Sequence, residues 1–135
     1  MVDNLTDEQR KACMRAVRAK NTSPEISVRR LVHAMGYRYA LHREDLPGKP
    51  DLVFVSRRKA IFVHGCFWHL HRCRRGQRVP VTNQGYWVRK RERNATRDRQ
   101  HIEVLRKSGW KVLVIWECWI QDCLSLGKKL QAFLQ

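Results

Sequence analysis

Cysteines and histidines gather between Cys66 and Cys73, directly after an apolar run that ends at Val63. Cys66, His71 and Cys73 form the pattern C-x4-H-x-C, and Cys118 follows a later apolar run. Zinc in structural sites takes four thiolate and imidazole ligands, so these residues predict a Cys3His zinc site. Buried apolar cysteines are the alternative explanation. Three other residues compete for the fourth position: Cys123, His69 and His64.

Acidic residues suggest a second, harder cation site. Asp51 stands immediately before the apolar run 52–55, where a buried strand would fix its position. Mg²⁺ prefers oxygen ligands and often takes only one or two carboxylates. From Pro50-Asp51 alone, however, ordinary turn chemistry at a strand start explains the carboxylate better. Glu25 is a second candidate, although an acid in the first turn of a helix usually complements the helix dipole.

Histidines near the cysteine cluster could act as proton acceptors. His64 and His69 titrate near neutral pH and could serve as general base or phosphate ligand. Each could equally be an ordinary surface residue. Asp98 could orient a histidine, although an exposed ion pair is the default for an acid in so charged a helix.

The charge of the chain favours a polyanionic partner. The 135 residues carry 28 Lys and Arg against 12 Asp and Glu, a net charge of +16. Arginine suits phosphate and guanine because its planar fork donates two parallel hydrogen bonds. A ribosome-associated or simply soluble basic protein remains an alternative. The basic residues form one stripe in a loop (Arg72, Arg74, Arg75, Arg78) and one in a helix (Arg89, Lys90, Arg91, Arg93, Arg97, Arg99).

Aromatic residues lie among these basic stripes. Phe67 and Trp68 are adjacent, so in an extended loop they cannot both face one core. Apolar wedges beside arginines can unstack and kink DNA. Trp87 and Met14 are further candidate wedges, although packing inside the domain is a strong alternative for Met14 and a fair one for Trp87. Three other tryptophans are predicted to be core residues: Trp110, Trp116 and Trp119.

The chain also suggests where the protein works. The start of the sequence is polar and acidic, so we expect no signal peptide. No apolar run approaches the roughly 18 residues that a membrane span requires. Five cysteines without a secretory leader favour reduced thiols in the cytoplasm over a disulfide framework. Cys13 and Cys123 are therefore expected to be ordinary thiols.

Capping signals and hydrophobic spacing predict the elements that position these residues. Ser23, Pro24 and Glu25 open a helix that Gly36 ends. An antiparallel hairpin of buried strands is followed by a charged helix and one more strand. We expect a single α/β domain over residues 1–135, with an N-terminal arm over 1–20. The predicted helices span residues 7–19, 24–35, 86–107 and 122–133, the predicted strands 37–41, 52–55, 60–63 and 111–116, and the predicted loops 42–50 and 64–85.

Several segments of the chain closely resemble the very-short-patch repair (Vsr) mismatch endonucleases, and the run HGCFWH is highly specific for that family. The resemblance implies a restriction-endonuclease-like fold with a central mixed β-sheet, flanking helices and a zinc-bound loop over residues 64–85. The segments that carry the resemblance are residues 14–17, 47–51, 62–69, 73 and 116–118.

The resemblance also implies an activity and its residues. Such enzymes nick one strand beside the T of a T·G mismatch that arises when 5-methylcytosine is deaminated. Asp51 would bind Mg²⁺ together with the backbone carbonyl of Val63. His69 would be the general base, supported by Asp98, and Glu25 would organise water at the metal.

Further roles are implied for the loop and its surroundings. His64 would contact the scissile phosphate or water at the metal. The zinc ligands would be Cys66, His71, Cys73 and Cys118. The wedges would be Phe67, Trp68 and Trp87 from the major groove and Met14 from the other side, with Arg72 and Arg74 on DNA phosphates.

The implied partner is duplex DNA carrying a T·G mismatch, bound by a monomer in the bacterial cytoplasm, at the nucleoid. A cytosine-5 methyltransferase system and other repair proteins would act alongside it, and no membrane would be involved. Two alternatives stay open: a non-catalytic zinc-containing DNA-binding module, and a restriction-type endonuclease without mismatch preference.

Overall fold

The computed structural model describes residue 11 and residues 23–67, 71–74, 76–77 and 82–135. Within them lies a sheet of four strands in the order β1-β2-β3-β4. The strands β1, β2 and β3 pair antiparallel, whereas β3 and β4 pair parallel. The expectation of a mixed sheet, made by a hairpin and a helical crossover, is therefore confirmed. The strands are β1 (Ala40–Leu41), β2 (Leu52–Phe54), β3 (Lys59–His64) and β4 (Lys111–Trp116).

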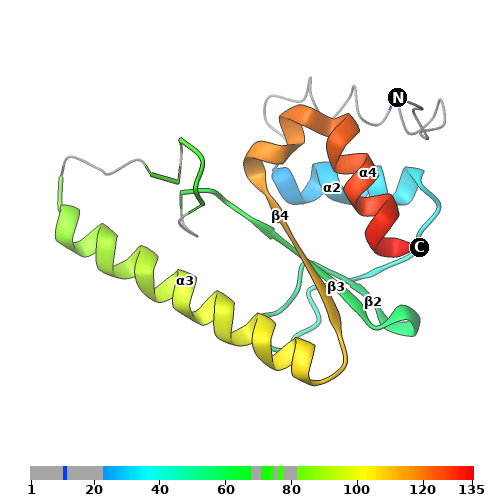
Figure 1. The fold of residues 1–135 in the computed structure, drawn as a ribbon, viewed down its shortest axis with the longest axis horizontal. Coiled ribbons are helices and arrows are strands. Elements are labelled where there is room, and N and C mark those ends of the chain that lie inside the picture. The colour runs from blue at the N-terminus through cyan, green and yellow to red at the C-terminus, as the bar shows by residue number, and fades with distance from the viewer. Residues whose placement is uncertain (1–10, 12–22, 68–70, 75, 78–81) are drawn as a thin grey trace.

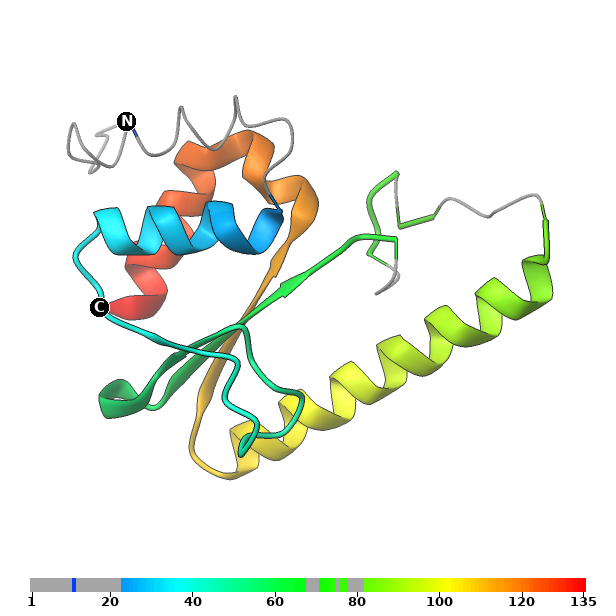
Figure 2. The ribbon, with the colours of Figure 1, turned by 180° about the vertical axis from the view of Figure 1, so that it is seen from behind.

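Helices cover both faces of this sheet (Figure 1). The helices α2 (Pro24–Ala34) and α4 (Cys123–Leu134) lie together on one face. The long helix α3 (Gln84–Lys107) lies on the other side, and its N-terminal half extends away from the sheet (Figure 2). Two short 3-10 helices, η1 (Val55–Arg57) and η2 (Glu117–Asp122), follow β2 and β4. No helix in the described part of the chain is long and apolar enough to span a membrane.

The alternation of side chains along β3 and β4 creates two cores. Ile61 and Ile115 face α2 and α4, where they join Leu31 and Leu130 in the larger core cluster. Phe62, Val112 and Val114 point the opposite way and pack against Leu105 of α3, with Trp110 at the edge. Because both faces are covered, these strands read as continuous apolar runs in the sequence.

Local signals explain why α2 begins where the sequence predicts. The Ser23 side chain accepts a hydrogen bond from the Ile26 amide (3.3 Å), and Pro24 occupies the first helical turn. Gly36 has φ +88°, the left-handed conformation that glycine adopts easily after a helix. The start of α4 is fixed in the same way, because the Asp122 side chain accepts from the Ser125 amide (3.3 Å).

Several boundaries differ from the sequence-based expectations. The first strand is only Ala40–Leu41, because Tyr37 and Tyr39 pack against the larger core instead of pairing. The second strand ends at Phe54, because Val55 opens a 3-10 turn that closes with Arg58 in the left-handed region (φ 52°). The predicted helix over 7–19 lies outside the described residues, apart from position 11.

Two predictions about individual residues are wrong. Cys123 is buried and disulfide-bonded, so it is not an ordinary thiol. Arg91 is only 2% exposed and therefore does not belong to a solvent-facing basic stripe on α3.

Candidate active site and metal centre

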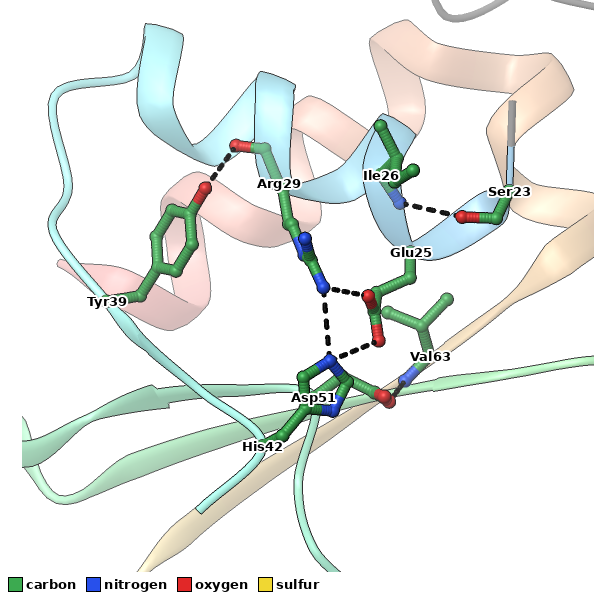
Figure 3. A network of polar contacts seen from close by, with 8 residues as sticks. All are labelled: Ser23, Glu25, Ile26, Arg29, Tyr39, His42, Asp51 and Val63. Atoms are coloured by element: carbon green, nitrogen blue, oxygen red, sulfur yellow. Dashed lines mark hydrogen bonds and ion pairs between the residues drawn. The ribbon is translucent and has the colours of Figure 1, made fainter. Parts of the chain in front are cut away.

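Glu25, His42 and Asp51 converge at the edge of the sheet, where α2 approaches the ends of β1 and β2 (Figure 3). Each offers one donor atom, and the three atoms all lie within 4.8 Å of one another. The Glu25 Oε1 atom lies 3.2 Å from the His42 Nε2 atom. Two carboxylates and an imidazole at this spacing can bind one divalent cation.

Strand pairing brings His42 to this position. Leu41 pairs with Leu52 in the antiparallel ladder, so the next residues outward are His42 and Asp51. His42 adopts a left-handed conformation (φ 48°), which ends β1 at this point. Glu25 arrives separately, from the first turn of α2. The structure thus brings Glu25 and Asp51 together, and it adds His42, for which the sequence predicts only a position in a loop.

The Asp51 carboxyl group lies in an electrostatically unfavourable place. Burial raises the pKa of Asp51 to about 6, and the neighbouring Glu25 carboxyl acts in the same direction. The hydrogen bond from the Val63 amide (2.6 Å) and the nearby His42 act in the opposite direction. Because two acids crowd one another here, a bound cation would relieve their repulsion.

Arg29 supplies a positive charge to the same cluster. Its guanidinium group pairs with the Glu25 carboxylate, and its Nη2 atom lies 3.1 Å from the His42 Nε2 atom. The Arg29 Nε atom is buried, with no hydrogen-bond partner among the described residues. The Tyr39 hydroxyl donates to the Arg29 carbonyl oxygen (3.3 Å) and ties the segment before β1 to α2.

A second cluster unites the four predicted soft ligands. The donor atoms of Cys66, His71, Cys73 and Cys118 all lie within 4.8 Å of one another. In a tetrahedral zinc site, bonds of about 2.3 Å to sulfur and 2.0 Å to nitrogen put neighbouring donor atoms roughly 3.5–3.8 Å apart. The Cys118 Sγ to His71 Nδ1 distance of 3.5 Å fits this geometry. The donor set therefore fits a zinc ion.

The parallel pairing of β3 and β4 explains this convergence. His64 is in register with Trp116, so the residues two positions further, Cys66 and Cys118, leave the sheet side by side. The His71 ring stacks on Trp116, with centroids 4.2 Å apart. Burial raises the pKa of the Cys66 thiol to about 12, and it also raises the pKa of the Cys118 thiol. Thiolates here would require a cation to balance them.

Aromatic and basic side chains surround the outer part of this loop. The Phe67 and Trp87 rings lie edge to face, with centroids 6.4 Å apart, although they come from the loop and from α3. Arg91 lies under the Phe67 ring (4.2 Å to the centroid) and donates to the Phe67 carbonyl oxygen (2.6 Å). Arg91 also donates to the Gly76 carbonyl oxygen, so it joins two separate parts of the loop to the helix.

His64 and Asp98 line a different cavity, between the sheet and α3, with a volume of about 570 Å³. His64 is buried between Phe62 and Trp116, with ring centroids at 5.7 and 5.3 Å. Arg72 lies at the mouth of this cavity and is exposed. Trp116 thus contacts both His64 and His71. It lines this cavity, whereas the sequence predicts a core residue.

The other predicted residues are Arg74, Val63 and three residues that the structure does not describe. Arg74 is exposed. The Val63 amide donates to Asp51, which brings Val63 to the carboxylate cluster. Three predicted site residues lie outside the described residues: Met14, Trp68 and His69.

Comparisons with known proteins agree with one another. Residues 2–75 match the family described as DNA mismatch endonuclease Vsr. The chain is 49% identical over 134 residues to the "Type II nicking enzyme V.XorIIP" of Xanthomonas oryzae pv. oryzae, covering 99% of this chain and 98% of that protein. It is 38% identical over 118 residues to the "DNA mismatch endonuclease Vsr" of Escherichia coli (strain K12), covering 87% and 75% of the two chains. A third relative is the "Type II nicking enzyme V.NmeAIP" of Neisseria meningitidis, at 36% identity over 135 residues, covering 100% and 96%.

Proposed function

Because the chain belongs to the family of Vsr DNA mismatch endonucleases and is a DNA-nicking hydrolase, we propose that its substrate is the T·G mismatch. It cuts one strand of duplex DNA beside the mismatched T, at a site left when 5-methylcytosine is deaminated. The convergence of Glu25, His42 and Asp51 within 4.8 Å is the observation that supports a hydrolytic site here.

Asp51 would hold the catalytic cation, Mg²⁺, with the backbone carbonyl of Val63 as a second oxygen ligand. A divalent cation at this point would stabilise charge on the phosphate and lower the pKa of the attacking water. Glu25 orients that water from the first turn of α2, at the place where its carboxylate meets Asp51. His69 accepts the proton, and Asp98 of α3 supports His69 in this role.

The Cys66, His71, Cys73 and Cys118 cluster holds a structural zinc ion. A loop of this length has little hydrophobic core of its own, so a bound ion would stabilise it in place of a core. Through Cys118, this site would attach the loop to η2, and the hydrogen bond from the Cys66 amide to Glu117 (3.4 Å) joins the same two segments. The loop then presents Phe67 in a fixed position.

Phe67 and Trp87 act as one wedge that opens the stacked bases, with Trp68 and Met14 as further wedges. Their edge-to-face contact supports this role, because two rings from separate segments reinforce each other. Arg72, Arg74 and the exposed arginines of α3 bind phosphates without reading sequence. A monomer in the bacterial cytoplasm would suffice, working after a cytosine-5 methyltransferase and before other repair proteins.

A matched pair of duplexes, T·G and T·A in the same context, tests the proposal with and without Mg²⁺. Cutting confined to one strand of the T·G duplex, and only with the cation, supports it. Equal cutting of both duplexes would indicate a restriction-type enzyme without mismatch preference. Tight binding with no cutting in any divalent cation would indicate a non-catalytic DNA-binding module.

A further inference from the structure

The Nε2 atom of His42 has two neighbours that require opposite hydrogen-bonding roles from it. The Arg29 Nη2 atom lies 3.1 Å away, and the Glu25 Oε1 atom lies 3.2 Å away. A guanidinium group can only donate a hydrogen bond, and a carboxylate can only accept one. One ring nitrogen cannot accept from the first and donate to the second, so no protonation state of His42 satisfies both contacts.

A cation resolves this conflict. With a positive ion between them, the Nε2 lone pair of His42 and the carboxylates of Glu25 and Asp51 all face the charge that they prefer. Without an ion, the Arg29 guanidinium is the positive group beside Glu25 and His42, and it takes the place of the missing charge. We propose that His42 is a nitrogen ligand of the divalent cation held by Asp51, and that Arg29 compensates the cluster when the cation is absent.

The spacing agrees with octahedral coordination. Bonds of about 2.1 Å place adjacent ligand atoms about 3.0 Å apart and opposite ligand atoms about 4.2 Å apart. The Glu25 Oε1 atom lies 3.2 Å from the His42 Nε2 atom, close enough for this carboxylate to hold a water ligand beside the imidazole. The limit of 4.8 Å for all three donor atoms accommodates both arrangements.

Arg29 need not leave for the cation to bind. Its guanidinium pairs with the Oε2 atom of Glu25, whereas the Oε1 atom faces His42. Only the contact with His42 must break. Arg29 also lines an open cavity of about 660 Å³ with Arg30, His33 and Tyr39, which gives its side chain room to turn.

The inference rests on the proposed function, because it concerns the same cation. It adds a consequence for metal preference. Imidazole is a good ligand for first-row transition ions, whereas Mg²⁺ favours oxygen. The site should therefore bind Mn²⁺ more tightly than Mg²⁺, and removal of the imidazole should reduce that difference. The loss should be at least the roughly 10-fold that removal of an outer-shell partner costs a metal site.

The test uses full-length protein with a complete zinc complement, loaded with Mn²⁺. Pulsed electron paramagnetic resonance detects nitrogen bound to Mn²⁺, and the Mn²⁺ and Mg²⁺ dissociation constants are measured by competition. The variant is His42→Asn, because asparagine tolerates the left-handed conformation of His42 (φ 48°). His42→Gly is the second variant, and circular dichroism checks the folding of both. His33→Gln is the matched control, an exposed histidine of the same helix as Glu25.

We expect nitrogen coupling in the wild type and in His33→Gln, its loss in both His42 variants, and at least 10-fold weaker Mn²⁺ binding with a smaller change for Mg²⁺. Absent coupling in the wild type, or coupling that persists without His42, would overturn the inference. Asp51→Asn separates the two proposals. If it abolishes nicking while wild-type Mn²⁺ shows no nitrogen, the catalytic proposal survives and the His42 ligand does not. If it leaves Mn²⁺ binding and nicking unchanged, both fall.

Discussion

Asp51→Asn should abolish nicking and yet make the protein more stable when no Mg²⁺ or Mn²⁺ is present. The asparagine fits both neighbours of the carboxylate: its oxygen can accept from the Val63 amide, and its amide can donate to Glu25. What is removed is a negative charge that lies partly buried beside another acid. Loss of activity through unfolding would instead lower stability, so the two effects can be separated.

The size of the effect follows from the pKa of Asp51. A rise from 3.8 to about 6 corresponds to at most about 3 kcal/mol against the ionised form, at about 1.4 kcal/mol per unit. Asp51 is partly exposed, so we expect about 1–2 kcal/mol after solvent screening. For a domain of this size, that increase would raise the melting temperature by roughly 3–8 °C.

The pH dependence has a definite sign. The folded protein holds the Asp51 proton more tightly than the unfolded chain, so ionisation destabilises the fold. This penalty is complete above pH 6 and disappears as the pH falls through 6 towards 3.8. The advantage of the variant should therefore be largest at neutral pH and vanish near pH 4. Saturating Mn²⁺ should remove or reverse it, because only the wild type gains binding free energy.

Thermal unfolding at pH 4 and pH 7.5 without added Mg²⁺ or Mn²⁺, with a nicking assay alongside, measures both effects. Asp45→Asn is the matched control: its hydrogen bond with Arg43 lowers the pKa of Asp45, so neutralising it should not stabilise the fold at neutral pH. An Asp51→Asn protein that melts lower than the wild type at pH 7.5, or that still nicks, would refute the reasoning.

Three further predictions concern the loop and its helix. Cys73→Ser should lose one equivalent of metal by elemental analysis and melt at lower temperature, and full retention of both would reject the ligand set. Phe67→Ala should lower the preference for T·G over T·A duplex in equilibrium binding by roughly 5–150-fold, or about 1–3 kcal/mol for one lost stacking contact; an unchanged ratio would count against the wedge. Arg91→Met should destabilise the fold by about 2–3 kcal/mol in urea unfolding, because two carbonyl oxygens lose a charged donor. The exposed neighbour Arg89, replaced in the same way, should change stability little, and equal effects would mean that burial of Arg91 is unimportant.

Local signals in the sequence were sufficient for parts of this structure. The start of α2 was predictable, because Ser23 and Pro24 act on the residues next to them. The soft-ligand cluster was also predictable. Cys66 follows β3 and Cys118 follows β4, and the carboxyl ends of parallel strands meet at one edge of a sheet.

Other features depend on pairings between distant segments, which local patterns do not encode. His42 reaches Asp51 only through the register of β1 on β2, and a slip of one residue would turn it away. Arg91 lies in a helix where basic residues predominate, and nothing local indicates that this one faces the loop. Its burial follows from the place where the zinc-ligand loop crosses α3, which is set by the tertiary fold.

The most direct test is a crystal of the whole chain soaked in Mn²⁺ and examined by anomalous diffraction at the manganese edge. We expect one manganese peak among Glu25, His42 and Asp51, bonded to oxygen and to the His42 nitrogen, and no manganese at the four-residue cysteine and histidine cluster. A peak bonded elsewhere, or none beside Asp51 at saturating Mn²⁺, would contradict the account.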